Sequence, residues 1–314
     1  MSTRNLFAVV CVMILLVLAI VVSCGGGGSS GLLPATVTHC YPAGVNPTLV
    51  VSAVTGSNTT ADGTCDKPYK TISAAIASYV SGSTIWVAPG TYDTALGEVF
   101  PIIVPAGVAL IGDEANKGKG SVNTEIIGNG QYLGALDAAV EPLTGATIAG
   151  LIVSATTVSA GQLPVGIIVN SNNVTIRNNH IVNSLEYGLY ILNGSQQVIT
   201  GNIMQNNNWG GIIFRNTSGS GAKIEHNRIT DNKYGIEVDS AAIGMDIGGG
   251  AAGSAGLNIL SCNTFNDVWS NTTGTISAMN NIWDHVPPSG NDIWTSGTVT
   301  FITTGATVST YPCL

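Results

Sequence analysis

"TIRNNHIVNSLEYGLYI", Thr175 to Ile191, decides the fold because its pattern recurs along the chain. The glycine that opens its last alternation of apolar residues recurs with spacings of 22, 23 and 24, at Gly166, Gly188, Gly211 and Gly235. An asparagine recurs with spacings of 23 and 25, at Asn179, Asn202 and Asn227, with looser matches after an insertion at Asn263 and Asn281. A glycine and an asparagine that both recur with a period near 23 indicate a repeat protein.

Each repeat predicts three short strands that stack on their counterparts in the next coil. Alternation along a strand decides which side chains enter the core. In the strand after the glycine we expect two inward sets, Ile167, Leu189, Ile212 and Ile236, and then Val169, Ile191, Phe214 and Val238. In the preceding strand we expect Ile176, Ile199 and Ile224 inward and Arg177, Thr200 and Glu225 outward. The aligned asparagines are expected to stack their amides at a turn.

Two other repeat folds have comparable signatures, and the sequence carries neither of them. Leucine-rich repeats need a recurring L-x-x-L-x-L frame, and left-handed hexapeptide helices need a six-residue period. We therefore predict an all-β chain that forms a single right-handed parallel β-helix.

The composition agrees with an all-β fold and excludes one class of partner. The 314 residues include 40 glycines, and only 9% are charged, against roughly 25% in ordinary globular domains. The net charge is −8 and no basic run is present. The sequence contains no cluster of lysine and arginine that could neutralise a phosphate backbone, so we expect no nucleic-acid binding.

The first residues predict export and lipid anchoring. Arg4 precedes an apolar run from Leu6 to Val22, which ends in VVSC and then GGGGSS. Such a pattern is typical of a signal peptide, and Val21-Val22-Ser23-Cys24 resembles the lipobox of bacterial lipoproteins. This resemblance implies cleavage after residue 23 and lipidation of Cys24, followed by a glycine and serine tether. The alternative is an uncleaved membrane anchor, for which 17 apolar residues are just long enough.

Four further cysteines remain after cleavage, Cys40, Cys65, Cys262 and Cys313. An even number in an exported domain predicts two disulfides. Of the three pairings, we favour Cys40–Cys65 and Cys262–Cys313, because each would tie down one end of the domain. Neither a CxxC motif nor a paired histidine spacing is present, so we predict no metal site.

The ends of the β-helix need covers for their open strand edges. YKTISAAIASYV predicts an amphipathic helix with Ile72, Ala75, Ile76, Tyr79 and Val80 on its apolar face. We divide the chain into the signal peptide 1–23, the tether and N-terminal segment 24–47, and one β-helix domain 48–314. Within this domain, 48–93 is the N-terminal cap and 270–314 is the closing segment.

Five segments resemble a known family. They are DGTCDKPYKTISAA from Asp62, TIWVAPGTYD from Thr84 and VALIGDE from Val108, joined near the end by MDIGGGAAGSAGLNIL and ISAMNNIWD. They are similar to the domain-of-unknown-function 1565 family of bacterial lipoproteins, with pectin-lyase-like β-helices. The resemblance spans about Thr48 to Asp284. It implies the fold and an exported lipoprotein, and it assigns no activity or catalytic residue.

Enzymes of this architecture that act on acidic polysaccharides bind substrate along the outer face of one sheet. By analogy, the outward stripes here are Ile168, Tyr190, Ile213 and Glu237, and then Asn170, Leu192, Arg215 and Asp239. If the protein is an enzyme, we expect Arg215, Glu237, Asp239 and Tyr190 to be its catalytic residues. A lyase would need Ca²⁺, for which two carboxylates are few; otherwise no cofactor is expected. The alternative is an exposed Arg215–Asp239 ion pair without catalytic use.

Two polar clusters are interpreted as structural. In the opening stretch, Arg177 and His180 are expected to face outward on other strands and Glu186 and Tyr187 to lie in a turn, so they do not converge. Trp283, Asp284 and His285 resemble a pectate-lyase run but lack its intervening residue, so they are assigned to capping.

We therefore predict an exported, lipid-anchored, non-catalytic β-helix that binds a polysaccharide or another envelope component. A lyase or epimerase acting on uronic-acid polymers is the first alternative, and a purely structural surface protein is the second. The sequence leaves open the ligand, the choice of membrane and the oligomeric state.

Overall fold

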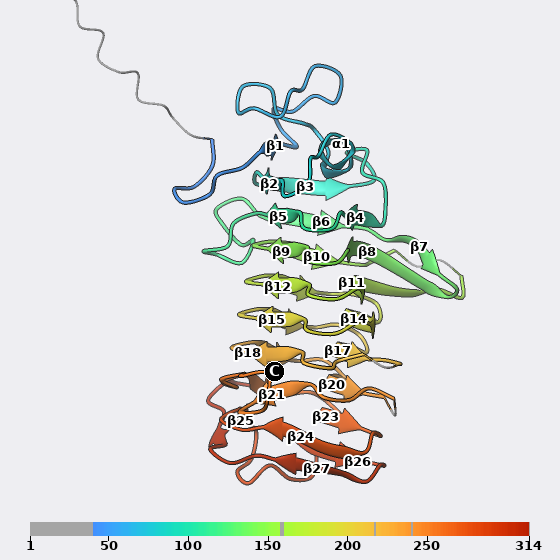
Figure 1. Cartoon of the computed structure of the whole chain (residues 1–314), viewed down its shortest axis with the longest axis vertical. Helices are drawn as coiled ribbons and strands as arrows, with labels where there is room; N and C mark the ends of the chain where they lie inside the picture. The colour runs from blue at the N-terminus through green and yellow to red at the C-terminus, as the bar shows by residue number, and fades with distance from the viewer. Residues whose placement is uncertain (1–39, 158–159, 217, 240, 314) are drawn as a thin grey trace, which may run out of the picture. The chain divides into compact units, whose positions relative to one another are not determined.

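The chain winds through three parallel β-sheets, contributing about one short strand to each sheet per coil, as a right-handed parallel β-helix (Figure 1). The computed structural model describes residues 40–157, 160–216, 218–239 and 241–313. The predicted signal peptide, Cys24 and most of the tether lie outside the described residues. No helix within the described ranges is long and apolar enough to span a membrane.

Each sheet contains strands from successive coils, and consecutive strands within a sheet are hydrogen-bonded neighbours. Sheet A contains β1 (Leu49–Val51), β2 (Thr84–Val87), β5 (Ala109–Ile111), β9 (Thr147–Ala149), β12 (Thr175–Arg177), β15 (Val198–Thr200), β18 (Lys223–Glu225), β21 (Asp246–Gly248), β24 (Gly274–Ala278) and β27 (Val299–Ile302). Sheet B contains β3 (Gly90–Asp93), β6 (Thr124–Ile127), β10 (Ile152–Ser154), β13 (His180–Val182), β16 (Ile203–Gln205), β19 (Arg228–Thr230), β22 (Ile259–Ser261), β25 (Ile282–Trp283) and β28 (Thr307–Val308). Sheet C contains β4 (Ile102–Val104), β8 (Leu136–Pro142), β11 (Leu163–Asn170), β14 (Tyr187–Asn193), β17 (Gly210–Phe214), β20 (Tyr234–Val238), β23 (Asn266–Ser270) and β26 (Ile293–Thr295), with β7 (Gly130–Leu133) antiparallel to β8.

The predicted inward side chains form the core. All eleven are fully buried: Ile167, Val169, Ile176, Leu189, Ile191, Ile199, Ile212, Phe214, Ile224, Ile236 and Val238. The register places equivalent residues opposite one another, as in Leu189 with Ile212 and Ile212 with Ile236. Each inward position therefore forms a column of apolar side chains through the stack, and the burial of these columns stabilises the fold.

The predicted asparagine ladder is confirmed. The amide of Asn179 donates to the side-chain oxygen of Asn202, and Asn202 donates in the same way to Asn227, each over 3.0 Å. The row continues through Asn258 to Asn281. The expectation for Asn263 was wrong, because Asn263 belongs to a second row, with Asn207 and Asn232, at the turn between sheets B and C.

The recurring glycine is explained by a close approach between coils. A Cβ atom on Gly211 would lie 2.4 Å from the Ile229 side chain and 2.8 Å from the carbonyl oxygen of Gly235 in the next coil. Real Cβ atoms do not approach other atoms so closely. The glycine that marks the repeat is therefore required by the distance between coils.

The N-terminal end carries the expected helix, in a shorter form than predicted. Helix α1 (Ile72–Ala77) begins after Thr71, whose hydroxyl accepts from the Ala74 amide as an N-cap, and it lies at the end of the stack in Figure 1. Ile72 and Ala75 are buried, but Tyr79 and Val80 lie beyond the end of the helix and are exposed. The predicted apolar face was therefore too long by one turn.

The C-terminal residues from 270 onward continue all three sheets through β24 to β28. After β28 the chain turns back along the outside of sheet B, where Tyr311 donates to Asp231 over 2.9 Å and Arg228 lies over the Tyr311 ring. Both predicted disulfides are present, Cys40–Cys65 and Cys262–Cys313. Two disulfides are typical of an exported protein.

The outward position expected for His180 needs correction. His180 is only 2% exposed, and neither ring nitrogen has a hydrogen-bond partner among the described residues. Burial lowers the pKa of His180 to about 4, and the charges of Lys119 and Arg228 act in the same direction. The side chain does leave the core, but it is covered on the outside of sheet B.

We expect Asn202→Ala to destabilise the protein by about 1–3 kcal/mol, because the Asn179 amide and the Ile176 carbonyl would lose a buried partner. Denaturant unfolding measures the loss. Asn208→Ala, at an exposed position of the same coil, is the control and should change the free energy of unfolding little. Equal losses in both variants would contradict a stabilising role of the ladder.

We expect His180 to contribute a fall in stability with decreasing pH between about 6.5 and 4, because the unfolded chain binds a proton there that the folded protein excludes. Acids whose pKa is raised, such as Glu237 and Asp267, contribute with the opposite sign, so the His180 slope is measured as the difference between the wild type and His180→Leu. One proton corresponds to a slope of about 1.4 kcal/mol per pH unit. His180→Leu should remove this slope, whereas His226→Asn, at an exposed histidine, should keep it. Unfolding free energies measured across this range test the assignment, and an unchanged slope in His180→Leu would contradict it.

Candidate functional site

The outer face of sheet C carries a column of side chains, one from each coil. Register aligns Ile168, Tyr190, Ile213 and Glu237, as the sequence predicts, and extends the column to Trp269 and Trp294. The sequence pattern did not predict the two tryptophans, because the insertion before β22 interrupts the repeat period. Continuing the alternation from Glu237 into β23 would have found Trp269.

The N-terminal part of this column does not face solvent. Ile168 is fully buried, Ile213 is 1% exposed and Tyr190 is 8% exposed. They belong to a second apolar cluster outside the main core, which includes Leu136 from β8 and packs against Tyr132 from β7. The expectation of an open stripe along the whole sheet was therefore wrong, and within this column only the residues from Glu237 onward are half-buried or exposed.

The second predicted stripe is interrupted. A register shift between Val169 and Asn170 pairs Asn170 with Asn193 instead of Leu192, and Leu192 is buried in the second cluster. Arg215 and Asp239 are neighbours as predicted, with 3.3 Å between Nη1 of the arginine and Oδ2 of the aspartate. Their side chains are 42% and 26% exposed, so the pair contributes only about 0–1 kcal/mol to stability.

Glu237 is held by two donors. The Tyr187 hydroxyl donates to its carboxylate over 2.6 Å, and the Trp209 indole N–H donates to the same oxygen over 3.3 Å. Burial raises the pKa of Glu237, although both donors and Arg215 oppose the shift. Burial also raises the pKa of Tyr187 and that of Tyr190.

The opening stretch therefore contributes more to this face than its sequence indicates. Tyr187 begins strand β14 instead of lying in the preceding turn, and its ring contacts Tyr190 edge to face at 5.6 Å. Arg177 is turned elsewhere, because its guanidinium donates twice to Glu114, over 2.8 and 2.9 Å. The four residues predicted for catalysis do lie together, but Glu237 and Arg215 are each engaged by neighbouring side chains.

Around Glu237 and in the coils after it, sheet C and the turns that lead into it carry a set of aromatic side chains. We call this set the aromatic row: Trp209, Tyr234, Phe265, Trp269 and Trp294. Trp269 and Trp294 stack at 5.5 Å between centroids and 10° between planes. Because stacked rings touch at about 3.5–4 Å, this distance means an offset stack that leaves part of each ring uncovered. Trp294 is 42% exposed and Phe265 is 51% exposed.

A cation and polar groups border the aromatic row. The Lys233 ammonium lies 4.0 Å from the centroid of Trp209 and 5.2 Å from that of Phe265. Lys233 also lines an open cleft of about 430 Å³ at the turn between sheets B and C. The other lining residues are Asn206, Asn207, Asn208, Asp231, Asn232 and Thr264. The face thus combines uncovered aromatic surface with hydrogen-bonding groups.

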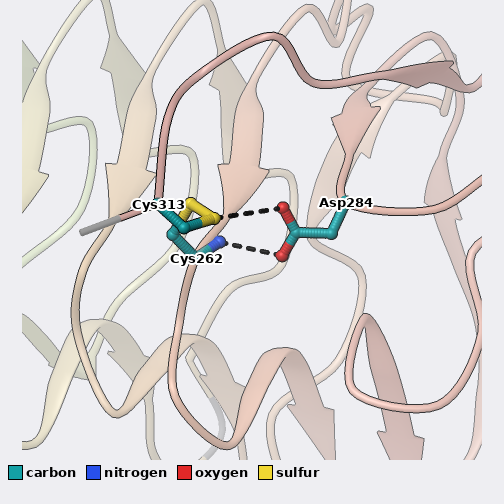
Figure 2. A group of neighbouring side chains, drawn as sticks. All are labelled: Cys262, Asp284 and Cys313. Atoms are coloured by element: carbon teal, nitrogen blue, oxygen red, sulfur yellow. Dashed lines mark hydrogen bonds between the residues drawn. A yellow bond between two sulfur atoms is a disulfide. The ribbon is translucent and has the colours of Figure 1, made fainter.

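Trp283, Asp284 and His285 lie away from this face. Trp283 is fully buried in β25, and Asp284 accepts from the backbone amide of Cys262 over 2.8 Å, beside the disulfide (Figure 2). They form no part of the outer face of sheet C. Their position at the end of the stack agrees with a structural assignment for Trp283.

Solved structures with a similar backbone include a pectate lyase, Pel9A, at 13% identity, with a TM-score of 0.55 over 85% of this chain and 78% of that one. They also include the pectin methylesterase from Aspergillus niger, at 14% identity and TM-score 0.45 over 86% and 87% of the two chains. At 13% identity, the similarity to the pectate lyase shows the fold alone. No curated protein matches the chain.

One family matches most of the described β-helix. The match covers residues 54–290, more than half of the chain, and includes the N-terminal and distal segments that carry the sequence resemblance. The chain therefore belongs to the family described as Protein of unknown function (DUF1565).

Proposed function

We propose that the protein is an exported, lipid-anchored module that binds a glycan on the C-terminal half of the outer face of sheet C. The observation that carries the proposal is the aromatic row, whose rings lie on successive coils with uncovered surface. Apolar faces of sugar rings pack on such aromatic surfaces, and neighbouring polar groups bind the hydroxyls. The anchor rests on the lipobox resemblance around Cys24.

The coil spacing supports a polymer as the ligand. Parallel strands repeat every 4.7–4.9 Å or so, a distance close to the length of one sugar unit. Contacts repeated on Trp269 and Trp294, which are aligned in successive coils, would therefore engage consecutive units of one chain, with the Tyr234 ring beside Trp269. The net charge of −8, and Glu237 with Asp239 at the border of the row, favour a neutral or weakly charged polysaccharide over a polyanion.

Catalysis is the second candidate, and one observation favours it. Glu237 is a half-buried carboxylate with a raised pKa beside a tyrosine and an arginine, as in many acid and base sites. Against it, the carboxylate is fixed by Tyr187 and Trp209, and Arg215 is paired with Asp239. A lyase needs a cation to stabilise the enolate-like intermediate, and these groups leave little for that task. We therefore assign the face to binding.

Affinity electrophoresis tests the proposal, with gels that contain β-glucan, galactomannan, alginate or polygalacturonate. We expect at least one neutral polysaccharide to retard the protein. Trp269→Ala and Trp294→Ala should each weaken binding at least about tenfold, a loss of about 1.4 kcal/mol. Tyr79→Ala, at an exposed aromatic residue beyond α1, is the control and should bind like the wild type. No retardation in any gel and no hit on a glycan array would favour the structural alternative.

The catalytic alternative predicts a different result. Incubation of the purified protein with polygalacturonate and with alginate, followed by ultraviolet absorbance of unsaturated product, should give no signal above a protein-free control. Glu237→Gln and Arg215→Ala should accordingly keep polysaccharide retardation within about threefold of the wild type, because neither residue belongs to the aromatic row. Product formation that disappears in Arg215→Ala would replace the binding proposal with an enzymatic one.

A further inference from the structure

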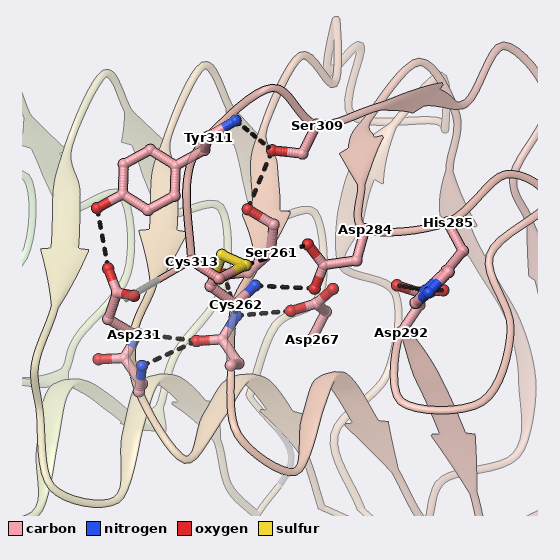
Figure 3. The surroundings of a disulfide bond; sticks show 12 residues. Asp231, Ser261, Cys262, Asp267, Asp284, His285, Asp292, Ser309, Tyr311 and Cys313 are labelled. Atoms are coloured by element: carbon pink, nitrogen blue, oxygen red, sulfur yellow. Dashed lines mark hydrogen bonds and ion pairs between the residues drawn. A yellow bond between two sulfur atoms is a disulfide. The ribbon is translucent and has the colours of Figure 1, made fainter.

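Three carboxylates converge at the C-terminal end of the stack, at the turn between sheets B and C. Asp267 is the second residue of β23, Asp284 follows β25 directly, and Asp292 precedes β26. One oxygen of each lies within 4.8 Å of the other two. Figure 3 shows the carboxylates of Asp267 and Asp284 side by side, with Asp292 and His285 beyond them.

These carboxylates are withdrawn from water and lack a strong positive partner. Asp267 and Asp292 are each 1% exposed, and Asp284 is half-buried. Within the described residues, no lysine or arginine forms an ion pair with any of them. The adjacent basic side chain is His285, whose Nδ1 lies 3.1 Å from Asp292 and which is 67% exposed. Three buried or half-buried acids at this separation repel one another strongly when ionised, unless a cation or a bound proton neutralises part of the charge.

One oxygen in the cluster has no hydrogen-bond donor. Asp267 accepts from the Asn263 amide over 2.7 Å through Oδ1, whereas its Oδ2 is buried without a partner among the described residues. In Figure 3 this second oxygen lies on the side of Asp284. Asp284 accepts from the Cys262 amide and Asp292 from the Ser289 amide, each over 2.8 Å. A buried carboxylate oxygen without a donor is unfavourable, so its direction into the cluster points to a missing ligand.

The donor chemistry selects the class of ion. Cys262 and Cys313 lie next to Asp284, with 3.9 Å between Cys313 Sγ and Oδ1, but the two cysteines form a disulfide and offer no thiolate (Figure 2). The ligand atoms that converge are therefore carboxylate oxygens, and the exposed His285 ring is not among them. Hard oxygen ligands without thiolates favour calcium over zinc or copper.

We propose that Asp267, Asp284 and Asp292 bind a calcium ion. The carboxylates offer up to six oxygens, and water completes the six to eight ligands that calcium takes. The ion would join β23 to the segment between β25 and β26, beside the Cys262–Cys313 disulfide. The proposed calcium site differs from the sequence-based expectation of no metal site. The three aspartates are far apart in sequence and form no recognisable spacing motif. The site does not depend on the proposed glycan binding.

Thermal unfolding of the full chain, first treated with a chelator, tests the proposal. We expect added calcium to raise the melting temperature of the wild type with an apparent Kd below about 1 mM, in the range of extracellular calcium modules. Asp267→Asn and Asp292→Asn should unfold at or above the chelated wild type, because repulsion is relieved, and should lose the calcium-dependent rise. Asp231→Asn removes a charge from the same end of the molecule and is the control. This variant should keep the calcium-dependent rise in melting temperature.

Terbium provides a second readout that does not depend on stability. Terbium replaces calcium in oxygen sites, and excitation of Trp283, next to Asp284, should sensitise its emission. Calcium should displace the signal, and Asp267→Asn should weaken it at least tenfold. Calcium-independent melting of the wild type together with absent terbium emission would overturn the proposal. Calcium binding that persists unchanged in both Asn variants would also overturn it, because the ion would then lie elsewhere.

Discussion

The structure depends on the exact superposition of successive coils, and this superposition is maintained at two turns by hydrogen bonds between asparagine side chains. In the first row each amide donates to the next asparagine and each side-chain oxygen also accepts a backbone amide, as at Asn179, Asn202 and Asn227. An asparagine has both donors and acceptors, so identical residues can satisfy one another indefinitely. Since these groups are buried, a shift of one residue would leave many of them without partners.

Because the register is fixed, equivalent residues of successive coils form columns. The side chains of each column determine whether that face of the sheet packs or is exposed. Inward columns are aliphatic and form the core. The outward column of sheet C changes along the stack from Ile168 and Ile213 to Glu237, and then to Trp269 and Trp294. The β7–β8 hairpin covers the first part, and the later coils have no such cover in the described residues. One face therefore contains both a second core and an exposed aromatic surface.

The sequence predicts the structural features that follow from the repeat period. It does not predict the features that arise where the chain departs from that period. Strand direction, the core columns, the first asparagines and the Arg215–Asp239 pair follow from spacing alone. The burial of Tyr190 does not, because Tyr132, which covers that face, lies in a hairpin outside the repeat. The insertion before β22 hid both Asn258 and the continuation to Trp269. His180 occupies an outward position in the pattern, and only the packing outside sheet B shows that it is buried.

The last coils contain both features on which the proposals about function rest, the carboxylate cluster and the aromatic row. Strand β23 carries Asp267 at the turn between sheets B and C and Trp269 two residues later, in the column that Trp294 extends. Two residues along a strand are about 7 Å, so the carboxylate cluster and the aromatic row share one rigid segment. Strand β26, which follows Asp292, is the edge strand of sheet C and has a hydrogen-bonded neighbour on one side only, whereas β23 is paired on both sides. Two kinds of contact therefore act at this end of the stack, beside the exposed aromatic rings. The disulfide joins Cys262, just after β22, to Cys313 in the C-terminal tail, and a bound cation would join β23 to the β25–β26 segment.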